Sequence, residues 1–452
     1  MSAPAAKPKP RLNPVRVKVK EVEPSQRVKD FGEVIIPYTR DEAIAEAQRC
    51  IQCGKPYCNE ACPIGQDARG YIKLMAQGNF DEAAAKIVWD NPLAECLGKV
   101  CYHFCEEACT IGKKGEPIAI RQLKRAALEF GKTPAPYDAV PKNGKRVAII
   151  GAGPSGIMAA WSLGKMGYDI TVFEGTKNLG GLMTMSIPGY RLTKGTFQKD
   201  LERMKNIGID YRVGVRIGRD KNFEDLFNSG YDAVFVAIGT MEPQGIKIPG
   251  TQLPGVLSAL DMLIDINTGQ KVTMGKRVAV IGGGDVAMDS VRSALRFGAE
   301  KVTLVYRRSR EEMPASDEEI AETQAEGIEF MYLTAPLEVL GTDKVAGLKC
   351  QKMQLGEPDE SGRRKPVPIP GSEFVLDVDT VILAIGQQPS LKGIPDIGIV
   401  VNKKGVIEGD PETGGTKQPG VYAGGGASVV HAMAAGRKAA LSIDRYLRPQ
   451  AS

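Results

Sequence analysis

The chain has 452 residues, which is enough for about three domains. Its 42% hydrophobic and 25% charged residues are typical of a soluble globular protein and exclude a disordered one. The net charge of +5 is too small for this length to indicate a dedicated nucleic-acid-binding protein, and only two histidines are present, which excludes chemistry that depends on several imidazoles.

The N-terminal segment, residues 1–38, is basic and rich in proline, and we expect it to be a solvated, extended arm that lies on a partner. It has no apolar targeting core, so a cytoplasmic location is predicted. The longest uncharged stretch, Val147–Gly164, is interrupted by glycines and by Pro154. This pattern predicts strand, turn and helix, so no membrane span is expected.

Helix signals follow the arm. Thr39 and Glu42 form a capping box ahead of apolar residues at helical spacing, and Asn79 with Glu82 repeats the signal. The second helix must end before Pro92. We therefore expect residues 1–140 to form a helical domain with cysteine-bearing loops, bounded by a change of composition near Pro134–Pro141.

The cysteines are concentrated in these loops. Of nine, only Cys350 lies outside the region from Cys50 to Cys109, and such a cluster predicts metal binding in a reducing compartment. A close run that ends in Cys-Pro, here Cys62-Pro63, is typical of ferredoxins. We favour iron–sulfur clusters over two structural zinc sites, which usually separate two Cys-x2-Cys steps by a longer gap. The candidate ligands form two groups: Cys50, Cys53, Cys58 and Cys62, then Cys96, Cys101, Cys105 and Cys109.

An internal repeat follows the composition change. GKRVAIIGAG (144–153) returns as GKRVAVIGGG (275–284), and YDAVFVAIGT (231–240) returns as VDTVILAIGQ (378–387). Two nucleotide-binding units of similar design are the simplest interpretation. The late strands add Gly239, Thr240 and Gly386 to the candidate cofactor-binding residues.

The first unit carries a full dinucleotide fingerprint. Its glycine-rich loop follows the strand Arg146–Ile150 and opens a helix, and Glu174 ends the next strand, where an acid takes ribose hydroxyls. The candidate residues are Gly151, Gly153, Pro154, Ser155, Gly156 and Glu174.

The second unit has the loop without the acid. Arg307 and Arg308, with Arg310 close by, stand after the strand Lys301–Tyr306, and arginine there would pair with a 2′-phosphate. The alternative is a solvated basic strand end. We interpret the two sites as FAD in the first and NADP(H) in the second, because an acid-ended and an arginine-ended site suit different dinucleotides. The remaining candidates of the second loop are Gly282, Gly284, Asp285, Val286 and Ala287.

From about Arg27 to Tyr446 the chain resembles the small (β) subunit of bacterial glutamate synthase. The resemblance rests on both cysteine groups, GAGPSG, Gly180-Gly181-Leu182, Ile187-Pro188, Arg191-Leu192 and VYRRSREEMPAS. The same module occurs in the large subunit of NADH-dependent ferredoxin:NADP oxidoreductase, the sulfide dehydrogenase α-subunit and the N-terminal half of dihydropyrimidine dehydrogenase. The resemblance implies an α/β fold: an N-terminal α-helical iron–sulfur domain, then two Rossmann-like, three-layer dinucleotide-binding domains of the disulfide-reductase type. We place FAD in residues 141–250 and 387–452, and NADP(H) in residues 251–386.

The resemblance also implies ligands and a partner. One [4Fe–4S] cluster would use Cys50, Cys53, Cys58 and Cys109. The other would use Cys62, Cys101, Cys105 and a Glu or Gln, but Lys124 stands at that place, and Cys96, Gln122 or Glu116 would have to complete the site. It adds Gly181, Leu182, Arg191, Gly424 and Gly425 to the cofactor-binding candidates, with Gly425 where the family has Asp and a helix at Val429–Ala440 facing the flavin.

In the family, NADPH reduces FAD, and two clusters pass electrons to a larger partner subunit. A disulfide reductase is excluded because no Cys-x-x-Cys follows Cys109. A self-contained amidotransferase lacks its nucleophile and substrate domain, and a non-enzymatic scaffold would not need two dinucleotide fingerprints. Glutamate synthase and the ferredoxin-linked oxidoreductase or sulfide dehydrogenase stay open, because the partner decides the product.

Overall fold

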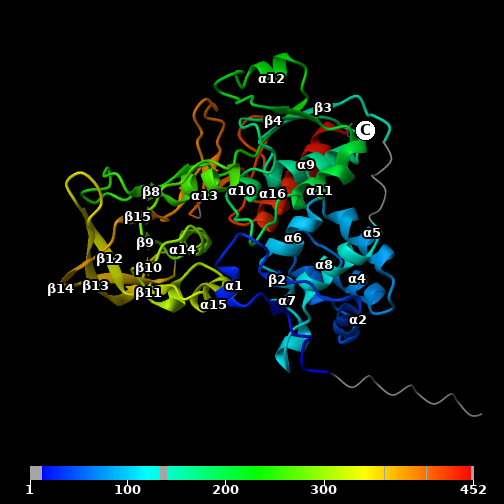
Figure 1. Ribbon diagram of the computed structural model, residues 1–452. Helices are drawn as coiled ribbons and strands as arrows, with labels where there is room; N and C mark the ends of the chain where they lie inside the picture. The colour runs from blue at the N-terminus through cyan, green and yellow to red at the C-terminus, as the bar shows by residue number, and fades with distance from the viewer. Residues whose placement is uncertain (1–12, 133–139, 361, 404, 449–452) are drawn as a thin grey trace, which may run out of the picture. The chain divides into compact units, whose positions relative to one another are not determined.

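The computed structural model describes residues 13–132, 140–360, 362–403 and 405–448, which form two compact units (Figure 1). One unit is helical and takes in residues up to Glu21, Ile35–Ala139 and Thr196–Ile207. The other contains the parallel sheets and takes in Val22–Val34, Val140–Gly195 and Gly208–Ser452. Two short segments, 22–34 and 196–207, therefore belong to a different unit from their neighbours in the chain.

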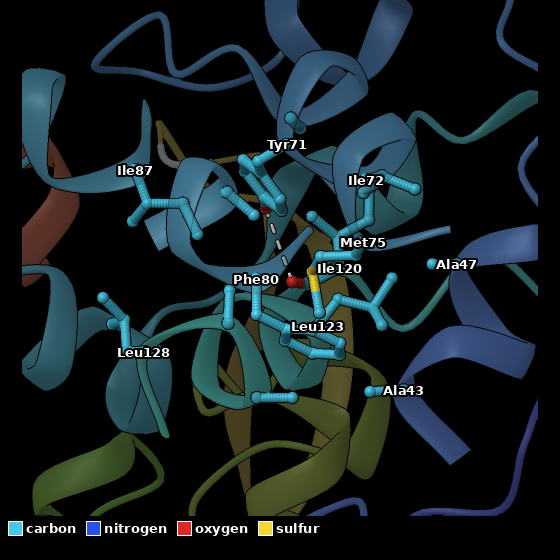
Figure 2. Close-up of a cluster of buried hydrophobic side chains, with 14 of the residues drawn as sticks. Ala43, Ala47, Tyr71, Ile72, Met75, Phe80, Ile87, Ile120, Leu123 and Leu128 are labelled. Atoms are coloured by element: carbon cyan, nitrogen blue, oxygen red, sulfur yellow. Dashed lines mark hydrogen bonds between the residues drawn. The ribbon is translucent and has the colours of Figure 1, made fainter. Parts of the chain in front are cut away.

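The helical unit is built on a buried apolar core. Figure 2 shows side chains from several helices converging on it, among them Ala43, Tyr71, Phe80 and Leu123, and the Tyr71 hydroxyl donates to the Ile120 carbonyl at 3.5 Å. The helices of the unit are α2 (Arg40–Gln48), α3 (Tyr57–Glu60), α4 (Ala68–Met75), α5 (Phe80–Asp90), α6 (Ala94–Val100), α7 (Phe104–Glu107), α8 (Ile120–Phe130) and α11 (Thr196–Met204), with the 3₁₀ turns η1 (Thr110–Lys113) and η2 (Lys205–Ile207).

Both predicted helix starts are present. The capping box of Thr39 and Glu42 is confirmed in both directions, and α5 begins after Asn79 and ends before Pro92. Asn79 makes no side-chain cap, and Asp81 instead accepts the Lys132 backbone N–H at 2.8 Å.

The prediction of a solvated arm is wrong for residues 13–38. Strand β1 (Lys20–Glu21) pairs with β2 (Ile35–Ile36), and the Val17 N–H donates to Glu46 at 2.8 Å. Helix α1 (Pro24–Arg27) ends on a buried arginine whose Nε lies 2.9 Å from the Glu326 carboxylate. The prediction considered only the charge of the segment. The structure shows that buried carboxylates pair with its arginine and accept its backbone N–H groups. Residues 1–12 lie outside the described part of the chain.

The second unit has two five-stranded parallel sheets. Their orders, β19-β6-β3-β4-β5 and β11-β10-β9-β15-β8, place the first strand of each glycine-rich motif in the middle. The first sheet contains β3 (Arg146–Ile150), β4 (Asp169–Glu174), β5 (Asp210–Val213), β6 (Ala233–Val236) and β19 (Val421–Ala423); the second contains β8 (Val256–Ser258), β9 (Arg277–Ile281), β10 (Lys301–Val305), β11 (Glu329–Met331) and β15 (Thr380–Leu383).

Helices cover these sheets. In the first, α16 (Val429–Leu447) runs beside α9 (Pro154–Gly164), and a Cβ on Gly436 would lie 2.0 Å from the Ser155 carbonyl oxygen, so only glycine allows this approach (Figure 1). The other helices of the unit are α10 (Leu182–Met185), α12 (Asp225–Asn228), α13 (Ala259–Thr268), α14 (Asp285–Arg296) and α15 (Asp317–Ala325), with the 3₁₀ turn η3 (Arg310–Glu312).

Shorter strands connect and extend the second unit. β7 (Glu242–Pro243) and β16 (Gln387–Gln388) pair antiparallel just after the two AIG strands, where the chain crosses between the sheets. A separate antiparallel sheet has the order β12-β13-β14, from Thr334–Leu340, Gly347–Pro358 and Arg364–Leu376. β17 (Val400–Val401) pairs with β18 (Ile407–Glu408). The α/β class and the two-sheet design are confirmed, and the exact domain boundaries stay predictions.

Candidate functional site

Four cysteines from two segments of the chain meet in one pocket of the helical unit. Cys50 and Cys53 lie in the loop between α2 and α3, Cys58 is on α3, and Cys109 precedes η1. Ile72, Ile111, Ile118 and Ile120 line the same pocket. All four thiols are free of disulfides. The pocket therefore presents sulfur ligands in apolar surroundings, as a buried metal cluster requires.

A second group of thiols surrounds Cys105. Burial raises the pKa of its thiol well above the usual value, and the Lys124 ammonium opposes this shift, whereas Cys101 and Cys62 add to it. Lys124 is only 7% exposed. The structure therefore brings Cys62, Cys101 and Cys105 together with a buried amine.

Tyr71 lies close to cysteines of both groups. Burial raises the pKa of its hydroxyl, and charges on Cys105, Cys62 and Cys58 add to the shift. The side chain is 1% exposed. Tyr71 is thus a buried neighbour of thiols from both groups.

Cys96 has different neighbours. It is fully buried on α6, and its backbone N–H donates to the Asp200 carboxylate at 3.1 Å. Burial, and then the charge of Asp200, raise the pKa of its thiol. The same carboxylate accepts from the Glu95 N–H and pairs with Arg203 at 2.8 Å. Cys96 therefore lies in the first turn of α6, where the Asp200 carboxylate of α11 accepts two backbone N–H groups.

Of the other residues weighed for the second group, Gln122 has a buried amide oxygen with no hydrogen-bond partner in the described structure. Glu116 is engaged elsewhere, because one of its carboxylate oxygens accepts the Arg16 N–H at 2.9 Å. On α8, Lys124 is the residue whose positive charge lowers the pKa of the Cys105 thiol.

Within the described ranges, no three His, Cys, Asp or Glu side chains are placed to share one metal ion. Burial, and charges on Cys50 and Cys109, raise the pKa of the Cys58 thiol to about 11. This thiol is neutral at pH 7 until a metal displaces its proton. Several thiols around a common apolar pocket suit an inorganic core of several atoms.

The first glycine loop fits a dinucleotide through its backbone. Gly151 has φ +106°, and a Cβ there would lie 2.4 Å from the Ala237 carbonyl oxygen. A Cβ on Gly156 would lie 1.9 Å from the Gly151 oxygen, whereas one on Gly153 would meet no atom within 4 Å. The loop is therefore tight against the protein at two glycines and open at the third. Pro154 and Ser155 begin α9 at this opening, so the positive end of the helix faces the position of a pyrophosphate.

Glu174 lies where the fingerprint places it. One carboxylate oxygen accepts the Ala152 N–H at 2.9 Å and the other accepts the Thr176 N–H at 2.8 Å. Each oxygen keeps a second lone pair for a ribose hydroxyl. The residue thus holds the glycine loop against the end of β4 as well as offering a ligand.

Other candidates gather at this edge of the first sheet. A Cβ on Gly181, before Leu182, would lie 3.0 Å from the Gly153 Cα. Ser155 donates to the Gly424 carbonyl at 3.4 Å, which brings the C-terminal loop with Gly425 to the start of α9. Both segments therefore border the opening at Gly153.

Thr240, Gly386 and Arg191 contact other parts of the second unit. Thr240, which follows Gly239, donates to Gln387 at 3.2 Å, and the Gly386 carbonyl accepts the Gln244 N–H at 2.9 Å. Arg191 forms ion pairs with Asp289 at 2.8 Å and Glu319 at 2.7 Å. Its guanidinium is thus shared between carboxylates of α14 and α15.

The second glycine loop has the same tight geometry. A Cβ on Gly282 would lie 2.2 Å from the Ala384 oxygen, and one on Gly283 would lie 2.5 Å from the Tyr306 ring. Gly284 caps α14, which starts with Asp285 and Val286 and buries Ala287 completely. The Asp285 carboxylate accepts the Ser316 N–H at 3.3 Å. Through Gly283, the loop therefore packs against Tyr306, the residue that precedes Arg307.

The arginine pair is split by the structure. Arg307 is exposed, whereas Arg308 is 4% exposed and its Nε donates to the Arg364 carbonyl at 2.8 Å. Arg308 also forms an ion pair with Asp359. The sequence did not reveal that residues of the β13–β14 hairpin meet this site, because antiparallel pairing brings them there from more than fifty positions away.

None of the helices in the described ranges has the length and apolar character needed to cross a bilayer.

Comparison with known proteins supports both halves of this description. Residues 145–440 match the pyridine nucleotide-disulphide oxidoreductase family, and residues 27–134 match the family described as dihydropyrimidine dehydrogenase domain II, 4Fe-4S cluster. The NADPH glutamate synthase small chain of Halomonas elongata is 38% identical over 447 residues, which cover 93% of this chain and 94% of that protein.

Two further likenesses differ in extent. The β subunit of the NADP⁺-dependent formate dehydrogenase of Moorella thermoacetica is 39% identical over 92% of this chain, but the match spans only 64% of that protein. Among solved structures, Mycobacterium tuberculosis FprA in complex with NADPH superposes with a TM-score of 0.58 at 20% identity, covering 68% of this chain and 85% of that one. This last likeness concerns the fold alone.

Proposed function

The chain belongs to the glutamate synthase small-chain family, and on that premise we propose that it is the electron-input subunit of a larger enzyme. As a member of this family it is an oxidoreductase that carries FAD and [4Fe–4S] iron–sulfur chemistry and uses NADP(H). When bound, these groups supply hydride transfer from NADPH to FAD and one-electron transfer through the clusters to a partner subunit. The proposed partner is the glutamate synthase large subunit, in the cytoplasm, with glutamine and 2-oxoglutarate as its substrates.

One observation carries this proposal. The chain combines two groups of free thiols with two glycine loops, yet its remaining cysteine, Cys350, is fully buried on β13. No dithiol is available beside a dinucleotide loop to pass electrons on as a pair. Electrons that enter as a hydride must then leave singly, and the thiol groups hold the carriers that allow this.

The residues of the chain have distinct tasks in this proposal. Cys50, Cys53, Cys58 and Cys109 hold one cluster. Cys62, Cys101 and Cys105 hold the second beside Lys124. The opening at Gly153 and the start of α9 receive the FAD pyrophosphate, and the loop from Gly282 receives that of NADP(H). Two clusters predict about eight irons per chain, with equivalent acid-labile sulfide.

The test compares electron acceptors. With NADPH, the purified chain should reduce artificial dyes but form no glutamate from glutamine and 2-oxoglutarate. Adding a glutamate synthase large subunit should restore glutamate formation. Turnover of a small organic substrate by the chain alone, at about 1–1000 per second, would contradict the proposal.

A second candidate is electron input to a different complex, such as a ferredoxin-linked oxidoreductase. The likeness to a formate dehydrogenase subunit favours it, because a similar module there serves another enzyme. Identifying the subunit that co-purifies with the chain separates the two, since each names a different partner.

A further inference from the structure

The β13–β14 hairpin ends in a turn that carries charge. At its tip the Asp359 N–H donates to the Arg363 carbonyl at 2.8 Å, and Pro358 pairs with Arg364. The Gly362 N–H donates back to the Asp359 carbonyl at 2.8 Å. These bonds define the backbone positions of both arginines at the tip.

The tip is fastened to the end of β10. The buried Arg308 donates through Nε to the Arg364 carbonyl and pairs with the Asp359 carboxylate. Its own carbonyl accepts the Leu333 N–H at 3.1 Å. Arg308 is therefore occupied by the protein, and its position determines where the hairpin tip lies.

Positive charge accumulates at this junction. Arg307 is exposed and makes no hydrogen bond or ion pair within the described part of the chain. Partial burial of its guanidinium, and then the charges of Arg308 and Arg363, lower its pKa. The charges of Arg308 and Arg363 thus both act on Arg307, beside the carboxylate of Asp359. Such a concentration of like charge favours the binding of an anion.

The junction borders the second glycine loop. Tyr306, whose ring limits the space at Gly283, directly precedes Arg307. Burial raises the pKa of Tyr306, and the charge of Arg363 opposes this rise. In a dinucleotide fold the end of this strand is where the adenine ribose lies, and its 2′ substituent is recognised there.

We propose that Arg363, at the tip of the β13–β14 hairpin, binds the 2′-phosphate of NADP(H) together with Arg307, and that Arg308 is a positioning residue that fastens the tip. This rests on the proposed binding of NADP(H) at the second loop. Two arginine forks approach the phosphate from different elements, so the hairpin contributes to the choice between NADPH and NADH.

Equilibrium binding tests this without turnover. Calorimetry on the full-length protein compares adenosine 2′,5′-bisphosphate with 5′-ADP. R363Q and R307Q should each weaken binding of the 2′,5′-bisphosphate about tenfold or more and leave 5′-ADP within about twofold. R364Q is the matched control, because among the described residues the Arg364 side chain bonds only to the Gly356 and Leu355 carbonyls of its own hairpin. It should bind both ligands like the wild type.

The role of Arg308 has its own readout. D359N removes the ion pair that fastens the tip and keeps all three arginines, so it should weaken binding of the 2′,5′-bisphosphate but not of 5′-ADP. R363K retains a charge, guards against loss of folding, and should give intermediate affinity for the 2′,5′-bisphosphate. FAD content and circular dichroism confirm that each variant is folded.

Two results would overturn the inference. If R363Q and R363K bound the 2′,5′-bisphosphate as tightly as the wild type while R307Q bound it weakly, Arg363 would not belong to the phosphate site. The proposed function would then be unaffected. Equal affinity of the wild type for both ligands would remove the NADP(H) assignment of the second loop as well.

Discussion

The thiol groups and the glycine loops form sites in opposite ways. The first thiol pocket borders the apolar core of its unit, because Ile72, Ile111, Ile118 and Ile120 belong to both. The glycine loops instead are enclosed by strand ends and helix starts, and a Cβ added at Gly151, Gly156, Gly282 or Gly283 would lie only 1.9–2.5 Å from a protein atom. Contacts within the protein therefore shape the dinucleotide loops, whereas the protonation of the thiols depends on what their sulfurs bind.

Loss of one cysteine should give the largest effect. C53A removes a ligand from the first pocket, so we expect about four of the eight proposed irons to be lost and hydrogen exchange to rise in the thiol loops of residues 39–130. The fold around Gly151 should persist, as read from FAD content. C96A is the informative comparison, because Asp200 and not a cluster thiol lies beside it. It should keep its iron, and an equal loss of iron from C96A would make Cys96 a ligand.

The second prediction concerns the arginine end of the second loop. Changing both Arg307 and Arg308 to Ala removes one phosphate donor and releases the hairpin tip, so KM for NADPH should rise about tenfold or more while KM for NADH barely changes. Steady-state dye reduction with each nucleotide measures this. Equal losses for both nucleotides would mean that the arginines only support the fold.

Two glycines of the first loop separate packing from binding. G156A places a Cβ against the Gly151 oxygen and should lower the free energy of unfolding by about 1–3 kcal/mol. G153A meets no protein atom, so the apoprotein should keep its stability while FAD affinity falls. Chemical denaturation of the apoprotein and FAD titration give the two readouts. A destabilised G153A apoprotein would show that the opening is not a ligand site.

The smallest effect is expected at Lys124. K124E places a carboxylate ligand beside Cys105 and should slow loss of iron from the second cluster in air, with little change in the dye reductase rate. Mössbauer spectra before and after exposure to air give the iron count of that cluster. Unchanged iron loss would mean that the residue at this position does not ligate the cluster.

The predictions that depend on local sequence patterns were confirmed. The capping box at Thr39, the end of α5 before Pro92 and the strand–loop–helix order at Gly151 and Gly282 were predicted correctly, because each depends on residues a few positions apart. The arm of residues 1–38 was misjudged from residue 13 onward. Its charges find partners such as Glu326, about three hundred positions later, and no local rule shows this.

The sequence by itself determined that the chain has eight clustered thiols, two dinucleotide loops and a family whose members carry FAD, NADP(H) and iron–sulfur clusters. Residue spacing encodes these features, since loop and ligand chemistry act over short stretches of chain. Only the tertiary structure decided that Cys96 lies with Asp200 and that a distant hairpin meets Arg308. The physical reason is that packing and ion pairing select partners by proximity in space, which residue order does not specify.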